Sequence, residues 1–76
     1  MRVRITRSAR KHRIGNAHIV AAMIDAGEPT AADDGALHYT GTDDRGIELH
    51  VVAIADDKRE GLAVIHAMPT EFRRRK

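Results

Sequence analysis

Two histidines, His12 and His66, are the side chains of this sequence best suited to proton transfer. An imidazole titrates near neutral pH, so it can act as a general acid or a general base without a metal ion. His12 lies in the segment SARKHRIGNAH, residues 8–18, where cations gather without any carboxylate. Cations beside a proton donor bind phosphate and stabilise the negative charge that develops during its cleavage. The sequence therefore predicts acid–base cleavage of RNA, with His12 and His66 as acid and base and Lys11 as a catalytic cation.

Positive charge gathers at both ends of the chain and negative charge in its middle. Residues 1–24 hold six cations and no acid, residues 25–60 hold ten of the eleven carboxylates, and residues 61–76 hold four cations. A fold that brings the two ends together would present one basic surface, which is typical of nucleic-acid-binding proteins. Taken alone, each basic segment is better explained as a solvated face with a frayed tail. The side chains expected to contact RNA, four by charge and one by stacking on a base, are Arg10, Arg13, Tyr39, Arg73 and Arg74.

The histidines also have ordinary structural interpretations. His12 can be an exposed residue at a helix end, where positive charge is favourable, and His66 can be a core histidine bonded to the backbone. His18 is expected to face solvent or a partner protein. Glu48 and His50 share one face of a strand. They are either an ordinary polar pair or the acid and base of a different small enzyme.

No metal ion or cofactor is expected. The Asp pairs at 33–34, 43–44 and 56–57 lie in loops without the ligand spacing of a calcium site, and we interpret them as turn residues. The sequence has no Cys for a thiolate metal site or a disulfide, no Gly-rich phosphate loop and no His-Glu-x-x-His motif. Its longest apolar run is far shorter than a membrane span, and its basic N-terminus lacks the apolar stretch of a signal peptide. The expected location is the cytoplasm, with no membrane contact.

The elements that must position these residues follow from hydrophobic periodicity and turn residues. A strand is expected at 2–6, helices at 8–14 and 17–26, a loop at 28–35, strands at 36–42, 46–55 and 61–69, and a short basic helix at the C-terminal end. The second helix is expected to end at Gly27 and to bury a stripe formed by Ile19, Val20, Met23 and Ile24. Turns at 43–46 and 56–61 would join the last three strands as hairpins. The cleaner core face of the middle strand contains Ile47, Leu49, Val51 and Ala53.

The element order β-α-α-β-β-β predicts a single α+β domain over residues 1–76. Its sheet is expected to be mainly antiparallel with three or four strands, and two N-terminal helices are expected on one face. A chain this small buries only about 60% of its unfolded surface on folding. A partner protein or a second copy is therefore expected to add stability.

Three segments resemble the BrnT toxins. KHRIGNAHIVAAMIDAGEP, residues 11–29, is similar to their Lys-His-x-Ile/Val stretch and the helix after it. DDRGIELHVVAI, residues 43–54, matches their polar turn and apolar strand, and VIHAMPTEFRRR, residues 64–75, is similar to their closing strand and arginine-rich end. The closing strand departs from the family pattern, because Ile65-His66-Ala67-Met68 stands where the family has Ile-Ser-Ala-Arg. The family's Trp-Asp near the start is also absent, and Thr6-Arg7 stands in that region.

The resemblance implies a RelE/BrnT-like fold and the toxin of a type II toxin-antitoxin system. Such a toxin is a metal-independent endoribonuclease that cleaves RNA, inhibits translation and is neutralised by a cognate antitoxin. The implied partners are that antitoxin and RNA, including ribosome-associated mRNA, in a homodimer or a toxin-antitoxin hetero-oligomer. The alternative is a non-catalytic module of the same fold that binds nucleic acid or protein.

Overall fold

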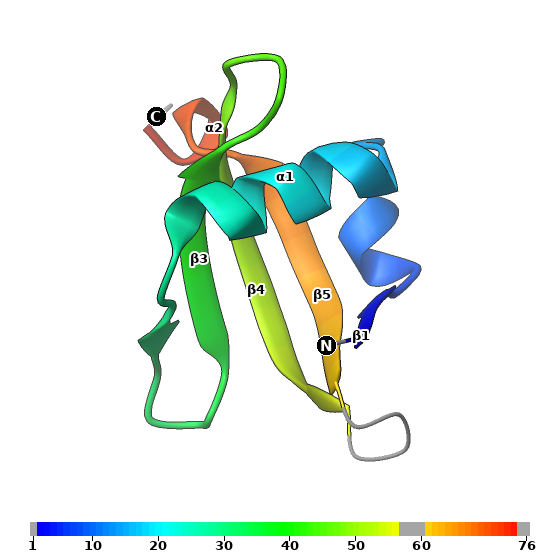
Figure 1. Ribbon diagram of the computed structural model, residues 1–76, viewed down its shortest axis with the longest axis vertical. Coiled ribbons are helices and arrows are strands. Elements are labelled where there is room, and N and C mark those ends of the chain that lie inside the picture. Colours follow the sequence, from blue (N-terminus) through cyan, green and yellow to red (C-terminus); the bar gives the residue numbers. More distant parts are fainter. Residues whose placement is uncertain (1, 57–60, 75–76) are drawn as a thin grey trace.

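The chain folds as an α+β structure in which five strands form one mixed sheet. The computed structural model describes residues 2–56 and 61–74. Its elements are β1 (Arg2–Ile5), the 3-10 helix η1 (Ser8–Arg10), α1 (Asn16–Ala26), β2 (Thr30–Ala31), β3 (Leu37–Thr42), β4 (Glu48–Asp56), β5 (Gly61–Pro69) and α2 (Glu71–Arg74). The strand order across the sheet is β1-β5-β4-β3-β2 (Figure 1).

The three long strands form the predicted antiparallel meander. β4 pairs antiparallel with β3 and with β5, and the turn at 43–46 is a hairpin closed by the Asp43 N–H on the Ile47 carbonyl at 2.9 Å. Most of the second predicted turn, residues 57–60, lies outside the described residues. The sheet is mainly antiparallel, as expected, but β1 joins β5 in parallel and makes it mixed. The expected number of three or four strands was too low, because a two-residue β2 adds a fifth strand. Parallel pairing of β1 requires a long return connection, which the helix and the meander supply.

α1 covers one face of the sheet with a stripe that agrees only in part with the one predicted (Figure 1). Ile19, Ala22 and Met23 are buried, whereas Ile24 is 76% exposed. The helix ends at Gly27, whose φ of 71° is the left-handed conformation that glycine adopts without strain, as expected. The rotation of the helix is explained by Gly41 of β3, which lies against the backbone of α1.

The first expected helix, at 8–14, is only the single 3-10 turn η1, and it packs against β5 rather than beside α1 on the sheet face. β5 has a bulge opposite Val52 and Ala53, beside two carbonyl groups that bind this segment. The hydroxyl of Thr6 donates to the Val64 carbonyl at 2.8 Å, and the hydroxyl of Ser8 donates to the Ile65 carbonyl at 3.1 Å. These bonds hold the chain beside β5 before it turns toward α1.

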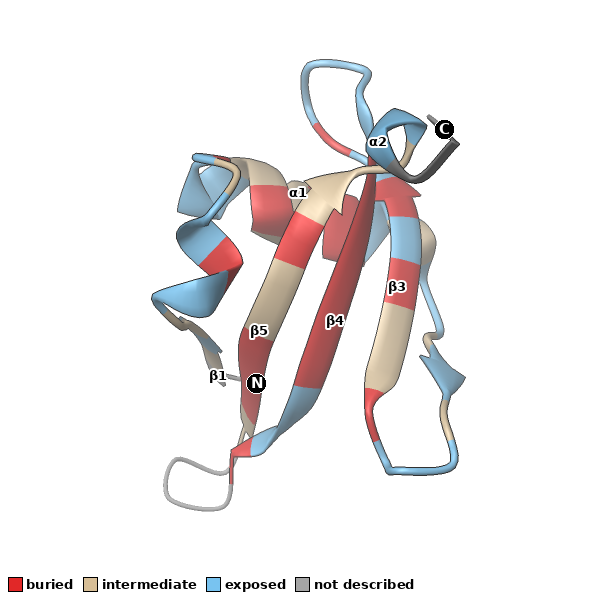
Figure 2. Cartoon of the chain, turned by 180° about the vertical axis from the view of Figure 1, so that it is seen from behind, coloured by how far each residue is buried: buried red, intermediate tan, exposed pale blue. Residues whose placement is uncertain are grey.

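The core lies between α1 and the sheet. Its fully buried large side chains are Ile19, Leu49, Val51 and Val64. Of the face predicted for the middle strand, Leu49, Val51 and Ala53 are fully buried, whereas Ile47 precedes β4 and is 39% exposed. Among residues 2–56 and 61–74, no long helix covers the opposite face of β3, β4 and β5, which is seen in Figure 2. In the described part of the chain, no helix has the length and apolar character needed to cross a membrane.

Candidate active site

Four histidines from distant parts of the sequence lie side by side on this uncovered sheet face. We call them the histidine row: His12, His66, His50 and His38. The strand register explains three of them. His38 and His66 both pair with Val52, on its two sides, and His50 lies two residues earlier on β4, so all three point to the same face. Their neighbours Leu49 and Val51 point into the core.

The rings follow one another across the sheet at short distances. The ring centres of His12 and His66 are 6.1 Å apart with an interplanar angle of 88°, and those of His66 and His50 are 6.1 Å apart at 66°. The ring centres of His50 and His38 are 5.2 Å apart, and the ring planes differ by 18°. The row therefore runs without interruption from the turn after η1 to β3.

His12 reaches the row from outside the sheet. Its segment is anchored to β5 by Thr6 and Ser8, as described above. Beyond His12 the chain turns back through Arg13, whose φ of 57° is uncommon for a residue with a side chain. On its other side the ring of His12 packs against that of Phe72 in α2, with 5.6 Å between ring centres. The structure thus brings the predicted pair His12 and His66 together, and neither ring is in the core, because both are half-buried.

His38 and His50 form the closest contact of the row. Nδ1 of His38 and Nε2 of His50 are 3.0 Å apart, so one ring donates an N–H to the other. The ring centres are 5.2 Å apart, which is about the 3.0 Å between the nitrogens plus the distance of each nitrogen from the centre of its own ring. The two nitrogens therefore lie close to the line that joins the ring centres. The rings therefore meet edge to edge and nearly coplanar, and not face over face. His50 is 8% exposed and His38 half-buried, so the bond is partly buried.

The sequence interpretation missed His38 and considered His50 only with Glu48. The signal that could have found the pair is the hairpin register. The Asp43–Gly46 turn aligns Thr42 with Glu48, and counting back from it places His38 and His50 on one face. The Glu48 carboxylate accepts a hydrogen bond from the Thr70 hydroxyl at 2.7 Å, which ties β4 to the start of α2.

The expected RNA-binding cations lie around His12. Arg10, Lys11 and Arg13 are exposed in its segment. The backbone of Arg73 and Arg74 belongs to α2, which the His12–Phe72 contact places next to the same segment. The side chains of these two arginines lie outside the described part of the chain.

Tyr39 does not join this site. It lies on β3 between His38 and Thr40 and therefore points to the α1 face, where it is 6% exposed and belongs to the core. Together with Met23 and Ile24 it lines an apolar groove of about 500 Å³ beside α1. The expected stacking of Tyr39 on a base is not compatible with this position, because the ring lies on the opposite face of the sheet from His12 and His66. The sequence pattern had not assigned Tyr39 to either face.

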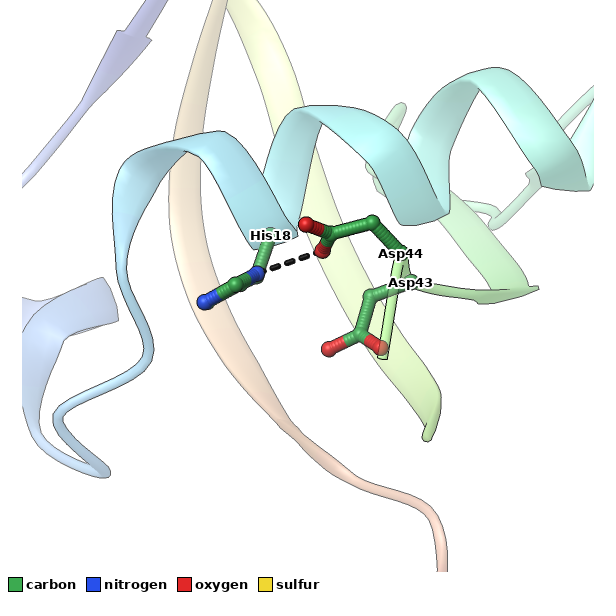
Figure 3. Close-up of side chains that lie close together, drawn as sticks. All are labelled: His18, Asp43 and Asp44. Carbon is green, nitrogen blue, oxygen red and sulfur yellow. Dashed lines mark hydrogen bonds and ion pairs between the residues drawn. The ribbon is translucent and has the colours of Figure 1, made fainter. Parts of the chain in front are cut away.

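A second cluster, His18 with Asp43 and Asp44, lies at the hairpin turn beside the start of α1 (Figure 3). Nδ1 of His18 is 2.5 Å from Oδ1 of Asp44, and single ligand atoms of the three residues lie within 4.8 Å of one another. His18 thus neither faces the row nor acts with it. Of the residues described, only these three meet a simple distance criterion for a metal site.

Asp43 is already fully engaged within its turn. Its Oδ1 accepts the backbone N–H groups of Arg45 and Ile47 at 2.8 and 3.0 Å, and its Oδ2 accepts Nε and Nη2 of Arg45 at 3.0 and 2.7 Å. Desolvation by burial raises the pKa of Asp43, but these four donors outweigh it and hold the pKa below the ordinary value of 3.8. Asp43 is a turn residue, as predicted, and has no lone pair directed at a metal ion.

Comparisons of this chain with protein-family models, with curated proteins and with solved structures found no match. The functional inference therefore depends on the histidine row, the cations beside it and the motif resemblance.

Proposed function

We propose that this chain is a metal-independent endoribonuclease of the BrnT-like toxin type, which cleaves RNA at the histidine row. The observation that carries the proposal is the contact between His12 and His66, whose ring centres are 6.1 Å apart at the edge of an uncovered sheet face. Two imidazoles at this separation can reach one phosphate group from two sides. Three exposed cations in the segment of His12, Arg10, Lys11 and Arg13, supply the charge that attracts it.

The chemistry requires one neutral and one protonated imidazole. The neutral ring takes the proton from the 2′-hydroxyl, which then attacks the phosphorus, and the protonated ring gives a proton to the leaving 5′-oxygen. Lys11 or an arginine beside it neutralises the extra negative charge on the phosphate oxygens in the transition state. Each imidazole ends in the other's starting state, so a proton exchange with water restores the site.

The resemblance of residues 11–29 and 64–75 to the BrnT toxins supports the biological setting. In that setting the protein acts in the cytoplasm on RNA, including mRNA on ribosomes, and a cognate antitoxin covers the site. Toxin and antitoxin would form a hetero-oligomer. A non-catalytic binding module of the same fold remains the alternative, and it differs from the nuclease only by the absence of cleavage.

Cleavage by purified protein tests the proposal directly. We expect the chain to cut RNA in the presence of a metal chelator, with a bell-shaped dependence of rate on pH. His12→Ala and His66→Ala should each reduce the rate by about 10² to 10⁴, which is the usual contribution of a proton-transfer group. His18→Ala is the matched control, because His18 lies outside the row, and it should cleave at the parental rate.

Thermal unfolding of each variant separates catalysis from folding. His66 is half-buried in β5, so a loss of activity with a lowered melting temperature would not count as catalytic. A folded His12→Ala protein that cleaves RNA and arrests growth like the parent would refute the proposed site. RNA binding without any cleavage by the parent would instead identify the non-catalytic module.

A further inference from the structure

The contact between His38 and His50 is of a different kind from the others in the row. The remaining neighbours meet ring edge against ring face, whereas these two rings direct nitrogen atoms at each other across 3.0 Å. One proton lies between the two nitrogens, because an imidazole pair at this distance needs one donor and one acceptor.

The distance between these two imidazole nitrogens is also close to the distance between two ligand atoms of one transition-metal ion. Zinc binds histidine nitrogen at about 2.0–2.1 Å in tetrahedral geometry, which places two such ligands about 3.3 Å apart. The observed 3.0 Å needs only a small opening of the pair and a turn of the rings about their Cβ–Cγ bonds. An ion in that position replaces the shared proton.

The backbone supports such a site. His38 and His50 lie diagonally opposite each other on adjacent antiparallel strands, so their Cβ atoms are fixed by the sheet rather than by a loop. β4 is the central strand of the three long ones, and most of its residues are buried. His66, with its ring centre 6.1 Å from that of His50, is the nearest further imidazole. Sites on strands hold their ligands more tightly in place than sites on loops.

We propose that His38 and His50 form a binding site for a divalent transition-metal ion with a preference for imidazole, Zn²⁺ or Cu²⁺. The two imidazoles are the protein ligands, and water completes the coordination. This inference is independent of the proposed nuclease, since metal binding is measured without RNA. If the nuclease proposal also holds, an ion bound next to His66 inhibits cleavage.

The cluster of His18 with Asp43 and Asp44 is the competing location on the same molecule. It offers a single imidazole, and Asp43 already accepts four hydrogen bonds within its turn. A transition-metal ion prefers imidazole over carboxylate, so the His38–His50 pair should bind more tightly. The two locations share no residue, which makes each a control for the other.

Isothermal titration of the full chain with zinc chloride tests the site. We expect one ion per chain, and we expect His38→Gln and His50→Gln each to weaken binding at least about tenfold, because losing even an outer-shell partner of a metal costs 10- to 100-fold. His18→Gln should leave the affinity within twofold of the parent. Thermal unfolding without metal confirms that each variant is folded.

Titration with Cu²⁺ followed by electron paramagnetic resonance counts the nitrogen ligands in the parent protein even if a variant fails to fold, and the His18 cluster can offer only one imidazole. The expected spectrum shows hyperfine splitting from at least two nitrogens. Three results would overturn the inference: no zinc binding by the folded parent, unchanged affinity in both row variants, or loss of binding in His18→Gln. Cleavage activity plays no part in these outcomes, so a failed nuclease proposal leaves them unaffected.

Discussion

Gly41 of β3 lies directly beneath Ala22 of α1, with no room for a side chain between them. A Cβ at position 41 would stand 2.7 Å from the amide nitrogen of Ala26, and closer still to the carbonyl oxygen of Ala22. Helix and strand therefore touch backbone to backbone. Because only small residues fit at this contact, Ala22 and Ala26 face the sheet and Ile24 is turned outward.

We expect Gly41→Ala to lower the free energy of unfolding by about 3 kcal/mol, because an overpacked core must displace backbone rather than a flexible side chain. Chemical denaturation measures the change. Gly15→Ala is the control, since the added methyl meets His18 at an ordinary 3.4 Å, and it should cost about 1 kcal/mol or less. Equal losses in the two variants would contradict the close contact.

A second prediction concerns the two hydroxyl groups that hold the His12 segment to β5. Thr6→Val and Ser8→Ala remove the bonds to the Val64 and Ile65 carbonyls, each worth about 1 kcal/mol of stability. If His12 is catalytic, RNA cleavage should fall further than RNA affinity, because the ring loses its position but no cation is removed. Thr30→Ala on β2, at the opposite edge of the sheet, is the control and should change neither quantity.

The third prediction tests the left-handed backbone at Arg13, where φ is 57°. Arg13→Gly and Arg13→Ala both remove the guanidinium, but only glycine adopts this conformation without a steric cost. We expect the glycine variant to be more stable than the alanine variant by about 1 kcal/mol. Denaturation curves measured side by side provide the comparison, and equal stability would mean that the turn relaxes.

The fourth prediction follows from the lowered pKa of Asp43. A carboxyl group whose pKa is lower in the folded than in the unfolded state stabilises the fold above its unfolded pKa. That contribution is lost as the pH falls through the folded pKa. Stability of the parent should therefore decrease as the pH falls below 3.8. In Asp43→Asn the stability at neutral pH should be lower and the decrease in acid shallower.

Urea unfolding at neutral and at acid pH measures both effects. Asp33→Asn serves as the control, because Asp33 is an exposed residue in the turn before β3. It should keep the parental dependence on pH. A decrease that is equally steep in Asp43→Asn and in the parent would show that other groups govern acid unfolding.

Local patterns were sufficient to predict the meander and the extent of α1. Alternation of apolar residues and turn chemistry act within a few residues, so β3, β4 and β5 were placed nearly at their observed bounds. Gly27 ends the helix as expected for the same reason. The face that α1 buries was predicted correctly for Ile19 and Met23 but not for Ile24. The exact rotation of the helix depends on Gly41, which is distant in sequence and has no side chain to reveal its role.

Pairing between distant segments accounts for the remaining differences. Apolar and polar residues alternate in RVRIT as in any half-buried strand, and nothing in this segment specifies β5 as a parallel partner. Ser8 suggested a helix N-cap, but its hydroxyl donates to the Ile65 carbonyl instead. In the site, chemistry alone selected His12 and His66, which the fold places together, and their catalytic role stays a prediction. His38 could be found only from the hairpin register, which the residue types alone do not give.

The parallel pairing of β1 with β5 also determines when the histidine row can form during synthesis. Arg2 pairs with Gly61 and Ile5 with Val64, so the first strand made has no partner until nearly the whole described chain has left the ribosome. The segment carrying His12 is anchored to the same strand. Contacts of such long sequence separation form late and slowly. The hairpin bearing His38 and His50 can close early, while His12 meets His66 only in the finished protein. A nascent chain therefore carries only the His38–His50 half of the histidine row.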